Sequence, residues 1–263
     1  MNKNTQRGFS LIELLVATAI LLFVVGAVMS YISTAQRRFD SEQTKIDMTQ
    51  ESREMMDQIA RDLHMAGYPN SRMFGPGVLP NPNWFDGTQV ATGIVRMTPT
   101  VLQFEGDMDG NGTVDVVRYQ VVPDFPPAPA LPVSCPCRIQ RGTSDTIVPA
   151  GKQPGGPLAQ PAPNFFVEAQ GIVNSGNTIP LGAVEGNFAA YTAEPVFRAY
   201  DVNGTAVPLP VDLNTINPAT GRSWVFDIRT IRVSLNVIGP TTDNQTRVRP
   251  VITMSSTAKV NNF

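Results

Sequence analysis

The sequence predicts an α+β protein: a long N-terminal helix spans a membrane and continues as a stalk packed on a β-rich, antiparallel C-terminal head. Two observations carry this prediction. Residues 9–36 contain a single charged side chain, Glu13, and exceed the roughly 20 apolar residues that a membrane helix needs. All 23 prolines lie at Pro69 or later, as do 18 of the 21 glycines, so little in the first 68 residues breaks a helix.

The N-terminal helix is predicted over residues 9–67. Its membrane part covers about 9–32, and its amphipathic part covers 33–67. The helix is expected to end at Gly67, because glycine is the usual C-terminal cap and Pro69 stands just beyond it.

The amphipathic part carries one narrow apolar stripe. Met56, Ile59 and Leu63 follow helical spacing, and Phe39 and Ile46 keep a seven-residue interval. The heptad pattern is too short and too interrupted for a free-standing coiled coil. The stripe therefore predicts packing of the helix against the protein's own head.

The acid inside the membrane run, Glu13, needs an explanation. An ionised carboxylate in hydrocarbon costs several kcal/mol unless a partner compensates it. Cleavage after Gly8 would remove the polar leader, residues 1–8, and leave a free amine at Phe9. The amine of an adjacent subunit would then be the obvious partner of Glu13. The alternative is a tolerated acid that snorkels to the membrane surface.

This arrangement resembles the class III signal of the type IV pilin family. The matching residues are Gly8, Phe9, Ser10, Leu11, Ile12 and Glu13. The resemblance implies that a prepilin peptidase cleaves after Gly8 and N-methylates Phe9. It also implies single-pass insertion into the bacterial inner membrane with the head in the periplasm, followed by entry into a pilus or pseudopilus at the cell surface.

The sequence at the end of the helix resembles one class within the type IV pilin family. The stretch ESREMMDQIARDLHMAGYP is similar to the helix end of PilW-type minor pilins. Many major pilins carry a proline near the middle of the membrane helix, where this chain reads VVGAVMSYIS with Gly26. That difference disfavours a major, filament-forming subunit.

Residues 68–263 are predicted to form the head, because short apolar alternations stand between turn signals. Residues 123–163 hold 11 prolines and predict a long Pro-rich loop, either an irregular surface insertion or a ribbon that binds a partner. The expected strands are TIRVSLNV with TRVRPVITMSSTAKV as its partner, GIVRM, TVLQFEG, TVDVVRYQVV, NFAAYTA and TAVPLPV.

The only cysteines, Cys135 and Cys137, form a CPC motif. An exported location permits a disulfide, although so small a ring gains little loop entropy. Zinc would need four ligands, and the sole histidine, His64, is placed on the helix. An unusual disulfide and two free thiols both stay open.

The segment DMDGNGTVD matches part of a calcium loop. Its candidate ligands at positions 1, 3, 5, 7 and 9 are Asp107, Asp109, Asn111, Thr113 and Asp115. Position 12 of an EF-hand loop requires Glu, and this chain has Arg118 there. The alternative is a β-hairpin whose Asp, Asn and Gly residues serve only the turn.

Other functions find little support in the sequence. A catalytic triad would have to recruit His64, which is expected to interact with the last carbonyls of the helix. The net charge of -2 gives no electrostatic footprint for nucleic acid, so none is expected as a partner. No cofactor is required, and Ca²⁺ in residues 107–115 is a candidate ligand.

The sequence therefore favours a minor pilin that takes part in type IV pilus assembly, in the initiation or tip complex that presents an adhesin and supports twitching motility. The implied partners are the prepilin peptidase, other minor and major pilins through the N-terminal helix, and a tip adhesin. A pseudopilin of a type II secretion system is the alternative, and a membrane-anchored extracytoplasmic enzyme is a third hypothesis.

Overall fold

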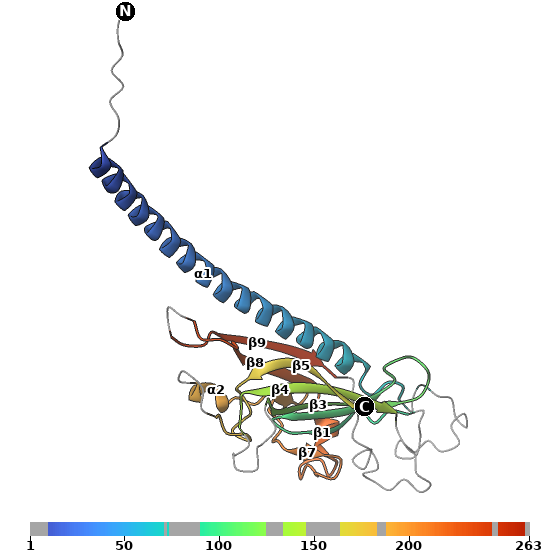
Figure 1. Ribbon diagram of the computed structural model, residues 1–263. Coiled ribbons are helices and arrows are strands. Elements are labelled where there is room, and N and C mark those ends of the chain that lie inside the picture. The colour runs from blue at the N-terminus through green and yellow to red at the C-terminus, as the bar shows by residue number, and fades with distance from the viewer. Residues whose placement is uncertain are drawn as a thin grey trace, which may run out of the picture. The chain divides into compact units, whose positions relative to one another are not determined.

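The computed structural model describes residues 10–70, 73, 90–124, 134–145, 164–182, 188–243 and 247–260 (Figure 1). The chain divides into two compact units, Met1–Ile46 and Asp47–Phe263, and the boundary falls inside the first helix. The α+β prediction is confirmed, because a long N-terminal helix is followed by an antiparallel, β-rich head with a pilin-like architecture.

The elements, in chain order, are α1 (Leu11–Met65), β1 (Ile94–Met97), β2 (Val101–Gly106), β3 (Asp115–Pro123), β4 (Cys137–Asp145), β5 (Asn164–Ile172), α2 (Ala189–Thr192), β6 (Phe197–Tyr200), β7 (Val211–Asp212), the 3₁₀ helix η3 (Trp224–Asp227), β8 (Thr230–Ile238) and β9 (Val251–Lys259).

The nine described strands form one sheet in the order β6-β8-β5-β4-β3-β2-β1-β7, and β9 pairs with β8. Every described strand pair is antiparallel. The predicted hairpin partner of β8 is confirmed, because β9 pairs with it along its whole length. The link between β5 and β8 is much shorter and consists of the pair Ile172 and Val237.

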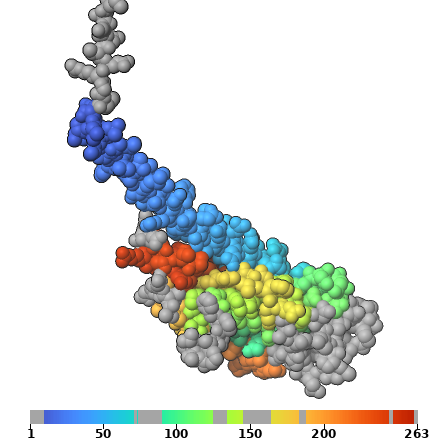
Figure 2. Space-filling view, in the orientation of Figure 1, coloured from blue at the N-terminus to red at the C-terminus, as the bar shows by residue number. Residues whose placement is uncertain are grey.

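The last third of α1, from Asp47 on, packs on this sheet within the unit Asp47–Phe263, as the C-terminal part of the apolar stripe predicts. Met56, Ile59 and Leu63 are all buried and share one core with side chains from the strands. Figure 2 shows the last turns of α1, in light blue, lying along the yellow β5. The stripe also contains Met48 and Met55, which the sequence analysis did not single out.

The helix ends at Met65, close to the predicted end. Gly67 takes a positive φ of 80°, the conformation in which a glycine cap is favoured. Its backbone N–H donates to the carbonyl oxygen of Glu105 on β2, at 2.9 Å. The exit of the helix is therefore bonded directly to the sheet. His64 lies in the last turn and is exposed.

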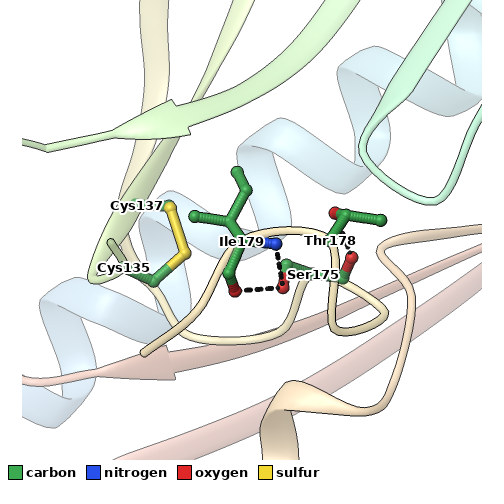
Figure 3. Close-up of a disulfide and its surroundings, with 5 residues drawn as sticks. All are labelled: Cys135, Cys137, Ser175, Thr178 and Ile179. Carbon is green, nitrogen blue, oxygen red and sulfur yellow. Dashed lines mark hydrogen bonds between the residues drawn. A yellow bond between two sulfur atoms is a disulfide. The ribbon is translucent and has the colours of Figure 1, made fainter. Parts of the chain in front are cut away.

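Cys135 and Cys137 form a disulfide, so of the two states left open the structure has the bridge. Both cysteines are buried, and the bridge lies beside the turn of Ser175, Thr178 and Ile179 (Figure 3). The Cys135 N–H donates to the Pro180 carbonyl oxygen at 2.8 Å. The CPC segment thus holds the chain that follows β5 against the start of β4.

Three sequence expectations need correction. The Pro-rich segment 123–163 is not one loop, because β4 lies inside it and pairs with β3 and β5; residues 125–133 and 146–163 lie outside the described part. The stretch NFAAYTA holds the short helix α2 rather than a strand. Only the end of TAVPLPV is in a strand, as the first residue of β7.

Strand β4 escaped prediction because its sequence, CRIQRGTSD, has few apolar residues and is surrounded by prolines. It is held by two neighbours: β3 pairs with it along all nine residues, and β5 covers its other edge. Backbone pairing in the middle of the sheet thus outweighs the weak strand propensity of its residues.

The unit Met1–Ile46 contains the first part of α1. Its large apolar side chains are exposed around the helix, among them Leu11, Leu21, Phe23 and Met29. By length and composition this helix can cross a membrane. The stripe residues Phe39 and Ile46 also belong to this unit and are exposed, so the predicted packing of the stripe is wrong for these two residues.

Candidate functional site

Two of the three predicted processing and assembly residues, Gly8 and Phe9, lie outside the described residues. The third, Glu13, lies in the first turn of α1. Its Oε2 accepts a hydrogen bond from the Ser10 backbone N–H at 2.9 Å, and the Ser10 carbonyl oxygen accepts from the Leu14 N–H at 3.2 Å. Ser10 is therefore the N-cap of the helix, and Glu13 occupies the N3 position.

This geometry is one half of a capping box, in which the N3 carboxylate satisfies an N–H that has no partner within the helix. The spacing S-x-x-E is visible in the sequence as Ser10 and Glu13, but the sequence analysis did not use it. The carboxylate is held next to the residue that follows Phe9.

The predicted calcium ligands lie together in the hairpin between β2 and β3. Carboxylate oxygens of Asp107, Asp109 and Asp115 lie within 4.8 Å of one another. Asp107 and Asp115 are buried, and Asp109 is exposed. The sequence thus predicted correctly that these three acids converge.

Hydrogen bonds within the hairpin explain how the acids are held. Asp107 accepts from the backbone N–H groups of Gly110, at 2.8 Å, and Gly112, at 3.0 Å. Both glycines have positive φ, 73° and 83°, which a residue with a side chain adopts only under strain. Asp115 accepts from the Met108 N–H at 2.9 Å. The turn interpretation is therefore satisfied by these bonds.

The same hairpin also brings together oxygen atoms of the kind that a calcium ion binds. Ca²⁺ binds oxygen ligands at 2.3–2.6 Å, so two oxygens on one ion lie up to about 5 Å apart. The Asn111 side chain hydrogen-bonds Asp109 at 2.8 Å, and its Oδ1 accepts from the Thr113 N–H at 2.6 Å. Arg118, at the position of the missing Glu, donates instead to Gln103 at 3.1 Å.

A third group of polar residues joins α1 to the sheet and was missed by the sequence analysis. Asp62 is buried on α1, and its Oδ2 accepts from the Tyr119 hydroxyl and from the Arg141 Nε, both at 2.6 Å. Its Oδ1 accepts from Gln58 at 2.7 Å. We call these four residues the Asp62 clamp. Asp62 follows Ile59 by three positions, which places it beside the apolar stripe; that position was the sequence feature that could have indicated a buried acid.

In the Asp62 clamp, the surroundings keep the Tyr119 hydroxyl protonated and Arg141 positively charged, so both can donate hydrogen bonds to Asp62. Burial raises the pKa of the Tyr119 phenol far above its usual range, and the charge of Asp62 raises it further, so the hydroxyl remains a donor. Burial lowers the pKa of Arg141, but the hydrogen bond and charge of Asp62 outweigh it and raise that pKa overall. The clamp is a structural joint between helix and head.

Comparison with known proteins yields one match. Residues 3–29 match the family model of the prokaryotic N-terminal methylation motif. No curated protein and no solved structure matches the chain. The matched segment includes Gly8, Phe9 and Glu13 and ends inside the membrane-competent part of α1. The motif points to the type IV pilin and pseudopilin family in general, and a membrane-anchored pilin agrees with the long apolar helix.

Proposed function

We propose that this chain is a minor pilin of the PilW type that takes part in type IV pilus assembly, in the complex that initiates or caps the pilus. The observation that carries the proposal is the methylation motif at residues 3–29, directly in front of a helix long enough to cross a membrane. The absence of proline from that helix supports a minor rather than a major subunit.

In this proposal a prepilin peptidase removes residues 1–8 and methylates Phe9 in the inner membrane. The helix then leaves the bilayer for a bundle of other minor and major pilins, and the periplasmic head contacts its partners and a tip adhesin. Glu13 would pair with the Phe9 amine of a neighbouring subunit, which offsets the cost of a carboxylate in an apolar bundle. Its present bond to the Ser10 N–H shows only that the carboxylate can accept at this end of the helix.

A Glu13→Ala strain tests the assembly role, with Glu54→Ala as the control because Glu54 is an exposed acid on the same helix. Surface pili and secreted proteins are scored in both strains. We expect Glu13→Ala to lose pili and Glu54→Ala to keep them. Loss of secretion with normal pili would instead support a type II secretion pseudopilin, which shares the same motif. Normal pili and normal secretion would contradict both functions.

The pilin-like architecture is that of structural assembly proteins, and we propose no reaction for this chain. A membrane-anchored extracytoplasmic enzyme is separated from an assembly subunit by the same strain. An anchored enzyme would keep its activity and its cellular role when Glu13 is replaced, because its anchor would still insert. An assembly subunit would lose its role while its head folds normally.

We also propose that the hairpin of Asp107, Asp109, Asn111, Thr113 and Asp115 binds Ca²⁺. Its support is the convergence of three carboxylates at the spacing of a calcium loop. Calcium should raise the melting temperature of the full-length protein, Mg²⁺ at the same concentration should raise it less, and Asp109→Asn should weaken the effect. An Asp57→Asn control should respond like the parent chain. An equal melting temperature in Ca²⁺ and in chelator would contradict the proposal.

A further inference from the structure

The head contains a cleft of about 550 Å³ whose lining carries four charged side chains. Glu51 comes from the second half of α1, Asp124 follows β3, Arg138 lies on β4 and Arg249 precedes β9. Apolar residues of the lining include Met48 and Ile238. A volume of this size lies within the range of cavities that bind small molecules. The cleft shares no residue with the methylation motif, the acidic hairpin or the Asp62 clamp.

Three charged side chains of the cleft contain buried atoms without hydrogen-bond partners. Within the described residues, nothing bonds to Oδ1 of Asp124, Nε of Arg138 or Nε of Arg249. No described ion pair within 4.0 Å joins Arg138 or Arg249 to an acid. Buried polar atoms in native proteins nearly always have a partner, so three orphans in one cleft call for a ligand or water.

Burial of the two acids of the cleft is only partly compensated, because the charge of Arg138 does not offset the burial of Asp124 and no cation lowers the pKa of Glu51. Burial raises the pKa of Asp124, and the lowering effects of the Gly171 N–H and of Arg138 do not cancel it. Burial raises the pKa of Glu51, and the nearby Asp124 raises it further. A positive group placed between the acids would reverse this repulsion.

The cleft therefore lacks partners of two kinds, one for its arginines and one for its acids. The guanidinium groups of Arg138 and Arg249 need an acceptor, for which a carboxylate is the best match. The unbonded Oδ1 of Asp124 needs a donor, and an ammonium group is the best match because its positive charge would also offset the repulsion between Asp124 and Glu51. A ligand with only one of these charges would be repelled by half of the lining. An apolar body between its charged ends would contact Met48 and Ile238.

We propose that this cleft binds a small zwitterion with an apolar body, either a free amino acid or a short peptide, whose carboxylate meets Arg138 and Arg249 and whose ammonium group meets Glu51 and Asp124. Binding at this cleft goes beyond the assembly function and does not depend on it.

The test is calorimetric titration of the full-length protein in detergent with leucine and with the dipeptide Gly-Leu. Two analogues serve as controls: 4-methylpentanoate lacks the ammonium group of leucine, and 3-methylbutylamine lacks its carboxylate. We expect saturable binding of a zwitterion and at least about tenfold weaker binding of both analogues, since each loses its charge-assisted hydrogen bonds. Tighter binding of leucine or of Gly-Leu distinguishes a free amino acid from a peptide.

Variants of its arginines test whether binding takes place in the cleft. Arg249→Gln should weaken binding about tenfold, and Arg222→Gln, which replaces an exposed arginine outside the cleft, should leave it unchanged. Arg138→Gln provides a second variant if Arg249→Gln does not fold. No binding of either zwitterion, equal binding of 4-methylpentanoate, or equal weakening by Arg222→Gln would each overturn the proposal.

Discussion

The two parts of α1, residues 11–46 and 47–65, belong to one continuous helix but differ in the surroundings of their apolar side chains. In the first part, leucine, isoleucine, valine and phenylalanine side chains are exposed around the helix, and Leu21 is 61% exposed. In the second part, one stripe is buried and the other faces are charged, and Leu63 is 0% exposed. The same residue type therefore meets solvent or lipid in one part and a protein core in the other.

This difference shows what each part can contribute. The exposed apolar part gains no stability within a single chain and needs a membrane or a bundle of other helices. The second part is committed to the head through its buried stripe and through the Asp62 clamp. Substitutions in the second part should affect folding, and substitutions in the first part should affect insertion and assembly. Variants in each part test that division.

Asp62→Ala should cost the head about 4 kcal/mol of unfolding free energy, because it leaves a buried phenol and a partly buried guanidinium without their acceptor. Asp57→Ala, an exposed acid on the same helix, should change the free energy by less than about 0.5 kcal/mol. Denaturant titration followed by near-ultraviolet circular dichroism measures both. Equal stability of the two variants would show that the clamp does not hold the helix to the head.

Leu63→Ala should cost about 3 kcal/mol, because it removes a fully buried side chain and leaves a cavity. Leu21→Ala truncates the same side chain in the exposed part and should leave the unfolding of the head unchanged. The same denaturant titration compares the two variants. A large effect of Leu21→Ala would contradict the division of α1.

Tyr119→Phe should cost about 1 kcal/mol, since it removes one hydrogen bond to Asp62 and leaves those of Arg141 and Gln58. Tyr68→Phe, which replaces an exposed tyrosine, is the matched control and should be neutral. A double variant with Asp62→Ala should cost less than the sum of the single effects, because both changes break the same bond. Simple additivity would indicate that the hydroxyl acts elsewhere.

Asp124→Asn should give the smallest change in stability, and this change should depend on pH. Its pKa is raised in the folded head, so the folded state binds its proton more tightly than the unfolded state does. This group therefore favours folding least when the pH is above its folded pKa, and its cost disappears when both states are protonated. Asp124→Asn should melt at a higher temperature than the parent chain at pH 7, and the difference should shrink as the pH falls through the acidic range. A difference independent of pH would contradict this explanation.

The sequence predicted what local patterns determine. The spacing of Met56, Ile59 and Leu63 indicated a buried helix face, and the alternation in TIRVSLNV indicated β8. The turn residues of DMDGNGTVD were also enough to bring Asp107 and Asp115 together, because both lie in one short hairpin.

Contacts between distant residues could not be predicted in the same way. Asp62 bonds to Tyr119 and Arg141, which lie 57 and 79 residues further along the chain, so no local pattern connects them. The four charged residues of the cleft come from four separate segments for the same reason. Strand β4 depends on its neighbours rather than on its own residues, and the proline content around it indicated a loop.

We propose that the mature chain begins at a processed Phe9 and that the first part of α1 serves insertion and assembly. Intact mass measurement and N-terminal sequencing of the mature protein test it most directly. We expect a chain that lacks residues 1–8 and starts at N-methylated Phe9. A mature chain that keeps Met1, or one cut beyond Tyr31 so that the apolar segment is lost, would contradict it.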